Sequence, residues 1–316
     1  MFHCLNDVIV SDLGLILDRN FSMIPEVNSQ YEFWINLRTP WWDYDVRFEE
    51  AVRKIPLKPV RDLQSDIYVY ALSFFNKYLY GHLWDTIQTL KTVEDSGIRG
   101  NLLCNVDSEV NDINHHWDIF GYPMGRRTAI DTTLQNYRVN KLIVPTADFI
   151  SPEVVTVDET NSFYAYYHAA CLVPHIKDWM YEKYTSGVKL DNVPRKLYLS
   201  RHKCESRKVL NEEEVIAFMK TRGFTIVLGN ESLEDHINLF HSASVIVGYH
   251  GSLFKNIFFS RNRPTIVEFH PAYRLDYSFV NQNKSCNVTD NYRFIPIESR
   301  ELNATINIKM LENLNL

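Results

Sequence analysis

Short apolar runs alternate with capped amphipathic stretches through the C-terminal part of the chain, and this rhythm constrains the fold more than any other feature. Strands are expected at residues 196–200, 224–228, 245–248 and 265–269, and helices at residues 211–221, 233–241 and 252–259. Strands that are joined in turn by helices form parallel sheets with right-handed crossovers. The sequence therefore predicts an α/β fold with a Rossmann-like C-terminal half.

The helices of this region have recognisable start signals. Asn211 is expected to cap the first helix, with Glu214 at the reciprocal capping-box position. Ser232 is expected to cap the second helix in the same way, with Asp235 three residues further on. These signals place the strand-to-helix loops, where ligands bind in open parallel sheets.

The N-terminal half has a weaker pattern of the same kind. Strands are expected at residues 66–71, 101–106 and 141–144, and helices at residues 80–94 and 162–184. A chain of 316 residues exceeds the usual size of one domain, and the turn-rich segment 184–195 is the best boundary. We therefore expect an N-terminal domain at residues 1–185 and a C-terminal domain at residues 186–316, whose last helix could pack back on the N-terminal domain.

Composition excludes some classes of function. A net charge of −6 argues against a nucleic-acid partner, because such proteins present basic surfaces. The five cysteines show no metal-ligand spacing and are expected to be free thiols in a reducing compartment. A leader-like start and a long apolar run are both missing from the sequence. We expect a cytoplasmic protein without a transmembrane segment, in a bacterium or in the host cell if the source is viral.

A basic loop follows the first strand of the C-terminal half. It carries Arg201 and Arg207 and leads to the helix start at Asn211. Guanidinium groups beside a positive helix end suit a diphosphate. A solvated basic loop is equally compatible with the spacing.

Two further polar segments end neighbouring strands. The third strand leads into Tyr249-His250-Gly251-Ser252-Leu253, where glycine permits close approach of a ligand to the backbone. The fourth strand carries Glu268, which could accept hydrogen bonds from ribose hydroxyls. The alternatives are an ordinary tight turn for the first segment and, for Glu268, pairing with a local arginine or lysine.

The motifs of this half together resemble glycosyltransferase family 61, which includes plant xylosyltransferases and protein O-linked N-acetylglucosaminyltransferases. The resemblance runs through SR…SRKVLNEEEV, SLEDHINLFHSASVIVGYHGSLFKNIFF and RPTIVEFHP, in the same order and spacing. In the N-terminal half it is confined to Asn76 and to YGHLWD at residues 80–85, which is similar to the family's N…HxxxD helix start. His82 and Asp85 are closer together here than in several relatives.

The resemblance implies a GT-B enzyme, with two Rossmann-like domains that face a cleft. The C-terminal domain would bind a UDP-sugar carrying xylose, another pentose or N-acetylglucosamine, and the N-terminal domain would bind a glycan or glycoprotein acceptor. Transfer would invert the anomeric carbon without a metal or other cofactor. Asp85 would be the catalytic base and His82 its orienting partner, since residues three apart share a helical face. Alternatively, Asp85 only stabilises the positive helix start, and His82 packs beneath Tyr80.

Two acidic or histidine-containing segments offer other interpretations. Asp43 and Asp45 form a DxD of the kind that holds a divalent metal in GT-A enzymes, but short motifs of this type occur often by chance. His115 and His116, with acidic neighbours, are interpreted as a polar turn rather than a metal site. The competing functions are thus a metal-dependent GT-A-like transferase and a non-catalytic module that binds sugar nucleotides or glycans.

Overall fold

The computed structural model describes residues 2–11, 14–27, 52–72, 80–105, 113–145, 174–272, 279, 291–300, 303–314 and 316. The chain divides into two compact units, Met1–Asp148 and Phe149–Leu316. Both contain a sheet with parallel strands and helices, so the predicted α/β class is confirmed. The predicted boundary after residue 185 follows helix α5 (Pro174–Thr185), whereas this division precedes it.

The C-terminal unit is built on a five-stranded sheet in which every pairing is parallel. Its strands are β8 (Arg195–Leu199), β9 (Phe224–Val227), β10 (Ala243–Tyr249), β11 (Thr265–Pro271) and β12 (Tyr292–Ile297). They lie in the order β12-β11-β10-β8-β9. The four strands expected from the sequence are confirmed, and β12 extends the sheet beyond them.

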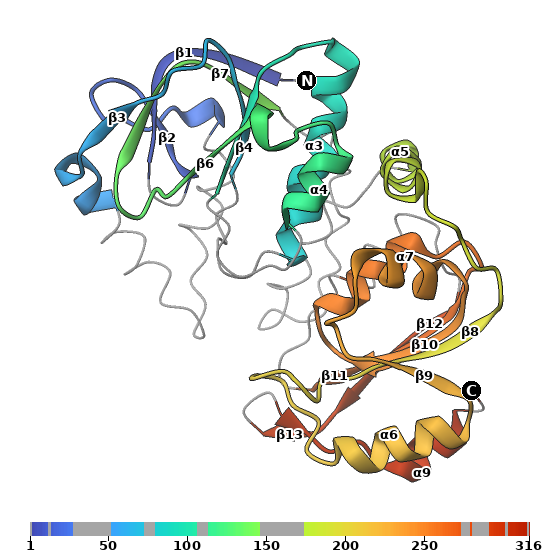
Figure 1. Ribbon diagram of the computed structural model, residues 1–316. Helices are drawn as coiled ribbons and strands as arrows, with labels where there is room; N and C mark the ends of the chain where they lie inside the picture. The colour runs from blue at the N-terminus through green and yellow to red at the C-terminus, as the bar shows by residue number, and fades with distance from the viewer. Residues whose placement is uncertain are drawn as a thin grey trace. The chain divides into compact units, whose positions relative to one another are not determined.

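Helices cover both faces of this sheet. Helices α6 (Glu212–Thr221) and α9 (Ile308–Asn313) lie on one side, and α7 (Leu233–His241) lies on the other (Figure 1). The segment η4 (Ser252–Phe259), expected as an α-helix, is a 3₁₀ helix. Leu311 of α9 packs in one core cluster with Val215 of α6, so the final helix contributes to the core of its own unit.

The N-terminal unit has a mixed sheet of seven strands, which run in the order β2-β1-β7-β4-β5-β6, with β3 also paired to β7. Their bounds are β1 (Phe2–Val10), β2 (Ile16–Leu17), β3 (Val60–Asp62), β4 (Tyr68–Ala71), β5 (Asn101–Asn105), β6 (Arg127–Ile130) and β7 (Asn136–Pro145). Strands β7, β4, β5 and β6 are parallel, whereas β1 is antiparallel to β2 and β7. This sheet is therefore mixed, whereas the sheet of the C-terminal unit is wholly parallel.

Helix α3 (Tyr80–Ser96) supplies Ile87, Leu90 and Val93 to the core of this unit, as its helical spacing predicts. The shorter elements are η2 (Ile55–Leu57), α4 (Ile113–Ile119) and η3 (Met124–Arg126), together with β13 (Ser299–Arg300) and β14 (Asn303–Ala304) of the C-terminal unit. None of the described helices is long and apolar enough to cross a bilayer. Among the described cysteines, Cys4, Cys104 and Cys204 are not in disulfides, as expected.

Candidate functional site

The strand order of the C-terminal unit defines where a ligand can bind. If the five strands are numbered along the chain, they lie across the sheet in the order second, first, third, fourth, fifth. The connections that leave β8 and β10 therefore diverge to opposite sides. Ligands of open parallel sheets bind at such a switch point, beyond the carboxyl ends of the two strands. Arg201 follows β8 there, and His250 and Gly251 follow β10. The structure thus brings these predicted residues to one edge of one sheet.

Arg201 is held in place by several internal contacts. Its side chain donates from Nε to the carbonyl of Arg207 at 3.1 Å and from Nη2 to the carbonyl of Ser206 at 2.8 Å. Its backbone N–H donates to Oε1 of Glu212, at the start of α6, at 3.2 Å. Arg201 is only 7% exposed, and this burial lowers the pKa of its guanidinium. The group nevertheless stays a cation at neutral pH, since an arginine titrates far above that range.

Two glycines lie at points of close approach near this cation. A Cβ on Gly248 would lie 2.8 Å from Cβ of Leu199, where β8 and β10 are neighbours. A Cβ on Gly251 would lie 2.2 Å from Nη1 of Arg201. The guanidinium therefore lies directly against the backbone of the Gly251 turn, which joins the basic loop and this turn into one site.

His250 and Glu268 form a buried pair at the same edge. Nδ1 of His250 lies 2.6 Å from Oε1 of Glu268, and their side chains are 5% and 0% exposed. Tyr292, at the start of β12, donates its hydroxyl hydrogen to Oε2 of the same carboxylate. Glu268 thus has side-chain partners on both oxygens, and these described partners are a histidine and a tyrosine rather than an arginine or lysine.

His270 lies beside this pair. Its ring centroid is 4.2 Å from that of His250, and its ring stacks on Phe294 with the centroids 4.9 Å apart. Within the described part of the chain, ligand atoms of His250, Glu268 and His270 lie within 4.8 Å of one another. That spacing alone would suit a metal ion, but the direct hydrogen bond between His250 and Glu268 already accounts for their placement.

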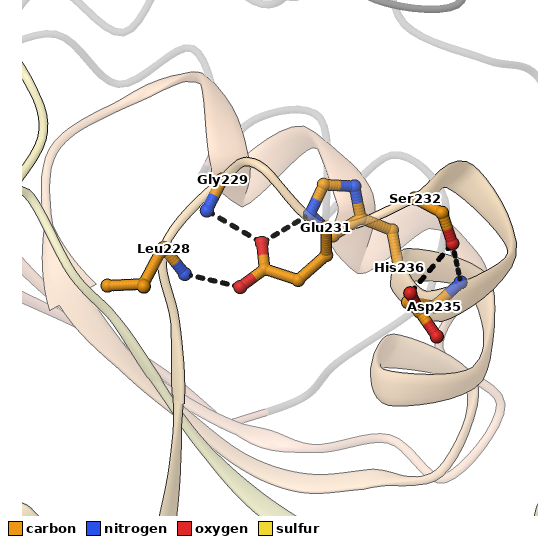
Figure 2. A network of polar contacts seen from close by, with 6 residues as sticks. All are labelled: Leu228, Gly229, Glu231, Ser232, Asp235 and His236. Carbon is orange, nitrogen blue, oxygen red and sulfur yellow. Dashed lines mark hydrogen bonds and ion pairs between the residues drawn. The ribbon is translucent and has the colours of Figure 1, made fainter.

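The turn from β9 to α7 carries a second glutamate–histidine pair (Figure 2). Glu231 accepts hydrogen bonds from the backbone N–H groups of Leu228 and Gly229, both at 2.7 Å, and lies 3.1 Å from Nε2 of His236. Ser232 accepts from the N–H of Asp235 at 3.1 Å, so the predicted cap of α7 is confirmed. This pair organises the turn and the helix start.

The other predicted donor-site residues have varied surroundings. Tyr249 packs in the core cluster that also contains Val215 of α6. Ser252 and Leu253 are half-buried at the start of η4, and Leu253 would touch a Cβ on Gly229 at 3.4 Å. The carbonyl of Arg207 accepts from Arg201, and its backbone has a φ of 55°.

Asn211 caps α6 by position but not through its side chain. The side-chain amide instead exchanges hydrogen bonds with the backbone of Ile306 at 2.9 and 3.0 Å, and it donates to Glu214 at 3.0 Å. The expected capping box is therefore wrong. The tertiary structure explains this difference, because the backbone of Ile306 in the C-terminal segment supplies the partners of the Asn211 amide.

The predicted residues of the N-terminal unit are less fully described. Residues 82 and 85 lie within the first two turns of α3, and Asp43 and Asp45 lie outside the described residues. His115 and His116 are on helix α4 rather than in a turn, with the first exposed and the second buried.

Three residues near the site were not anticipated from the sequence. His270 could have been found, since residues two apart in a strand face the same side and Glu268 was already in view. Glu212 and Tyr292 gave no such signal. Glu212 accepts a hydrogen bond from the hydroxyl of Ser200 at 2.7 Å and so orients the loop after β8. This contact, like that of Tyr292 with Glu268, depends on how the chain packs.

Comparison with known proteins identifies the family of the chain. The family model for glycosyltransferase 61 matches residues 1–267, and so includes the Arg201 loop and the His250 turn but ends one residue before Glu268. A search of curated proteins found no match. Because the family model covers well over half of the chain, the chain belongs to glycosyltransferase family 61 and is a transferase that moves a glycosyl group from a donor to an acceptor substrate.

Proposed function

We propose that the protein is an inverting, metal-independent GT-B glycosyltransferase that takes xylose, another pentose or N-acetylglucosamine from a UDP-sugar. The acceptor is a glycan or glycoprotein, and the reaction takes place in the cytoplasm. The donor diphosphate binds beyond the carboxyl ends of β8 and β10.

One observation carries this proposal. At the switch point of a parallel sheet, the buried guanidinium of Arg201 lies against the turn formed by His250 and Gly251. A departing UDP carries two negative phosphate groups, and a cation that is already fixed in place stabilises that charge without reorganising. Because Arg201 has a fixed orientation, it can serve as such a group.

Binding of UDP tests the donor site directly. Arg201→Ala should weaken UDP binding by about 1.5 to 3 kcal/mol, the usual worth of a charge-assisted contact. Isothermal titration of the full chain measures this, and Arg222→Ala is a matched control, since Arg222 lies over Phe218 in the same unit. Because Arg201 also holds the loop, Arg201→Lys is measured beside it. Unchanged UDP affinity in folded Arg201→Ala would remove this residue from the site.

Turnover separates the proposal from its two rivals. Release of UDP from a UDP-sugar in the presence of the protein contradicts a purely binding module. Activity should survive EDTA, because cationic side chains neutralise the leaving group. Loss of activity in EDTA and its recovery with manganese would instead support a metal-dependent transferase, and Asp43→Asn with Asp45→Asn would then abolish turnover.

Inversion by one displacement needs a base on the acceptor side, and Asp85 with His82 as its partner is the proposed group. Asp85→Asn should keep UDP affinity and lower kcat by about 10² to 10⁴. Transfer at the wild-type rate by this variant would place the base elsewhere.

A further inference from the structure

The loop after β8 is braced by the C-terminal part of the chain. Residues 208–211, which lead from this loop into α6, run beside residues 303–306 in the parallel direction. The backbone N–H of Ala304 donates to the carbonyl of Lys208 at 2.9 Å, and its carbonyl accepts from the N–H of Leu210 at 2.7 Å. Two segments that are far apart in the sequence therefore form a short ladder beside the basic loop.

This ladder is anchored on both sides. The side chains of Val209, Ala304 and Ile306 are buried in one core cluster, so the two segments are packed together as well as hydrogen-bonded. The side-chain amide of Asn211 exchanges hydrogen bonds with the backbone of Ile306, and its Nδ2 also donates to Glu214. Asn211 thus fastens the start of α6 to the same segment.

One peptide bond connects this ladder with the cation of the proposed site. The backbone N–H of Lys208 donates to Oδ1 of Asn303 at 2.8 Å. The carbonyl of Arg207 accepts from Nε of Arg201 at 3.1 Å. This N–H and this carbonyl belong to the same trans peptide bond, whose atoms are coplanar and whose two polar groups point in opposite directions. Asn303 therefore sets the direction in which the carbonyl faces the guanidinium.

The backbone of Arg207 explains why this peptide bond needs to be held. Its φ of 55° lies in the left-handed region, which is unfavourable for a residue with a side chain. Such a conformation persists where the surrounding contacts determine it. If the acceptor on Asn303 is removed, the peptide can rotate toward a more common conformation. The guanidinium of Arg201 then loses one of its two carbonyl partners.

We infer that Asn303 is a positioning residue for Arg201, and that it acts through the peptide bond between residues 207 and 208. Resting on the proposed function, it keeps the guanidinium fixed where the donor diphosphate binds. A cation that is held in place stabilises phosphate charge without reorganising. The Asn303 side chain is only partly buried, so its replacement removes a hydrogen bond and little of the core.

Hydrogen exchange of the backbone amides, followed by NMR of the full chain, tests this contact without any substrate. In Asn303→Ala the amide of Lys208 should exchange about three- to tenfold faster, because it loses its acceptor. Asn303→Asp keeps an acceptor oxygen and should retain the slow exchange. Unchanged exchange of this amide in Asn303→Ala would overturn the inference.

Asn307→Ala is the matched control in the same segment. Asn307 also accepts from a backbone N–H, that of Lys309 at 2.9 Å, but this contact lies at the start of α9. Its removal should leave the exchange of the Lys208 amide and the affinity for UDP as in the wild type. Equal effects of Asn307→Ala and Asn303→Ala would show general damage to the segment and would overturn the inference.

A double-mutant cycle with UDP tests whether Asn303 acts through Arg201. Asn303→Ala alone should raise the Kd for UDP about three- to tenfold, as measured by isothermal titration. In the Arg201→Ala background it should change the Kd by less than about twofold, because the group that it positions is gone. An unchanged Kd in the single variant, or the full loss of affinity in both backgrounds, would overturn the inference.

The two measurements also separate this inference from the proposed function. If the wild type binds no UDP, or if Arg201→Ala binds UDP as tightly as the wild type, the proposed donor site fails. The exchange of the Lys208 amide still decides whether Asn303 holds the peptide bond beside Arg201.

Discussion

Two glutamate–histidine pairs in the same unit have similar contact distances and different physical surroundings. Glu231 and His236 lie 3.1 Å apart at the turn before α7, with side chains 20% and 6% exposed (Figure 2). Glu268 and His250 lie 2.6 Å apart in the sheet, with side chains 0% and 5% exposed. The first carboxylate retains some contact with water, and the second has none.

The groups that stabilise the glutamate differ between the two pairs as well. Burial tends to raise the pKa of Glu231, but the backbone N–H groups of Leu228, Glu231 and Gly229, followed by nearby His236, outweigh this effect and lower it. Burial lowers the pKa of His236 despite the nearby carboxylate, so this histidine favours its neutral form. Short distance between a glutamate and a histidine therefore does not define an ion pair. The other groups around the carboxylate decide whether the histidine must be charged.

The largest difference between the pairs should appear in stability. Glu268→Ala should cost about 3 to 5 kcal/mol, as breaking a buried pair does. Glu231→Ala should cost about 1 kcal/mol, because water can reach the freed N–H groups. Urea unfolding followed by circular dichroism measures both. Equal losses would contradict the distinction between the pairs.

Ligand binding should separate the two histidines next. His250→Asn should weaken UDP binding by about tenfold, since it removes a hydrogen-bonding ring from the turn of the proposed donor site. His236→Asn is the matched variant and should bind UDP as the wild type does. Isothermal titration gives both values. Comparable weakening in the two variants would mean that the loss of UDP affinity is not specific to the pair of His250 and Glu268.

A smaller effect tests whether the Glu231–His236 pair only organises a turn. Ser232→Ala should cost about 1 kcal/mol, since the hydroxyl accepts from the N–H of Asp235 at the start of α7. Ser232→Thr keeps the cap and should stay near the wild type. Urea midpoints measure both variants, and a loss of UDP affinity in Ser232→Ala would link this turn to the donor site.

The smallest expected effect is a pH dependence of stability from His236. Because its pKa is lowered in the folded state, the unfolded chain takes up the proton first as pH falls. The stabilisation is complete above the ordinary histidine pKa of about 6.5 and is lost as pH falls toward the folded value. His236→Asn should reduce the loss of stability between about pH 7.5 and about pH 5.5.

Comparison of the urea midpoints at the two pH values checks this expectation. Some dependence should remain in the variant, because burial, followed by the charge of Arg261, lowers the pKa of His241 too. An unchanged pH dependence in His236→Asn would contradict the neutral assignment of His236 in the folded protein.

Local signals predicted much of the C-terminal unit. Apolar runs predicted the strands around residues 196–200 and 265–269. The cap at Ser232 was predicted from a side chain that lies three residues before its backbone partner. Such features require only neighbouring residues. Asn211 shows the limit of this approach, because its amide bonds to Ile306, which is 95 residues away.

The sequence by itself determined that polar groups would follow the strands of a parallel sheet, and it named Arg201, His250 and Glu268 among them. Only the tertiary structure decided how these groups pair. The sheet order sets β10 between β8 and β11, so Arg201 lies against Gly251, and Glu268 lies between His250 and Tyr292. The physical reason is that local patterns fix strands and loops, whereas the partner and charge of a buried group depend on which strands become neighbours.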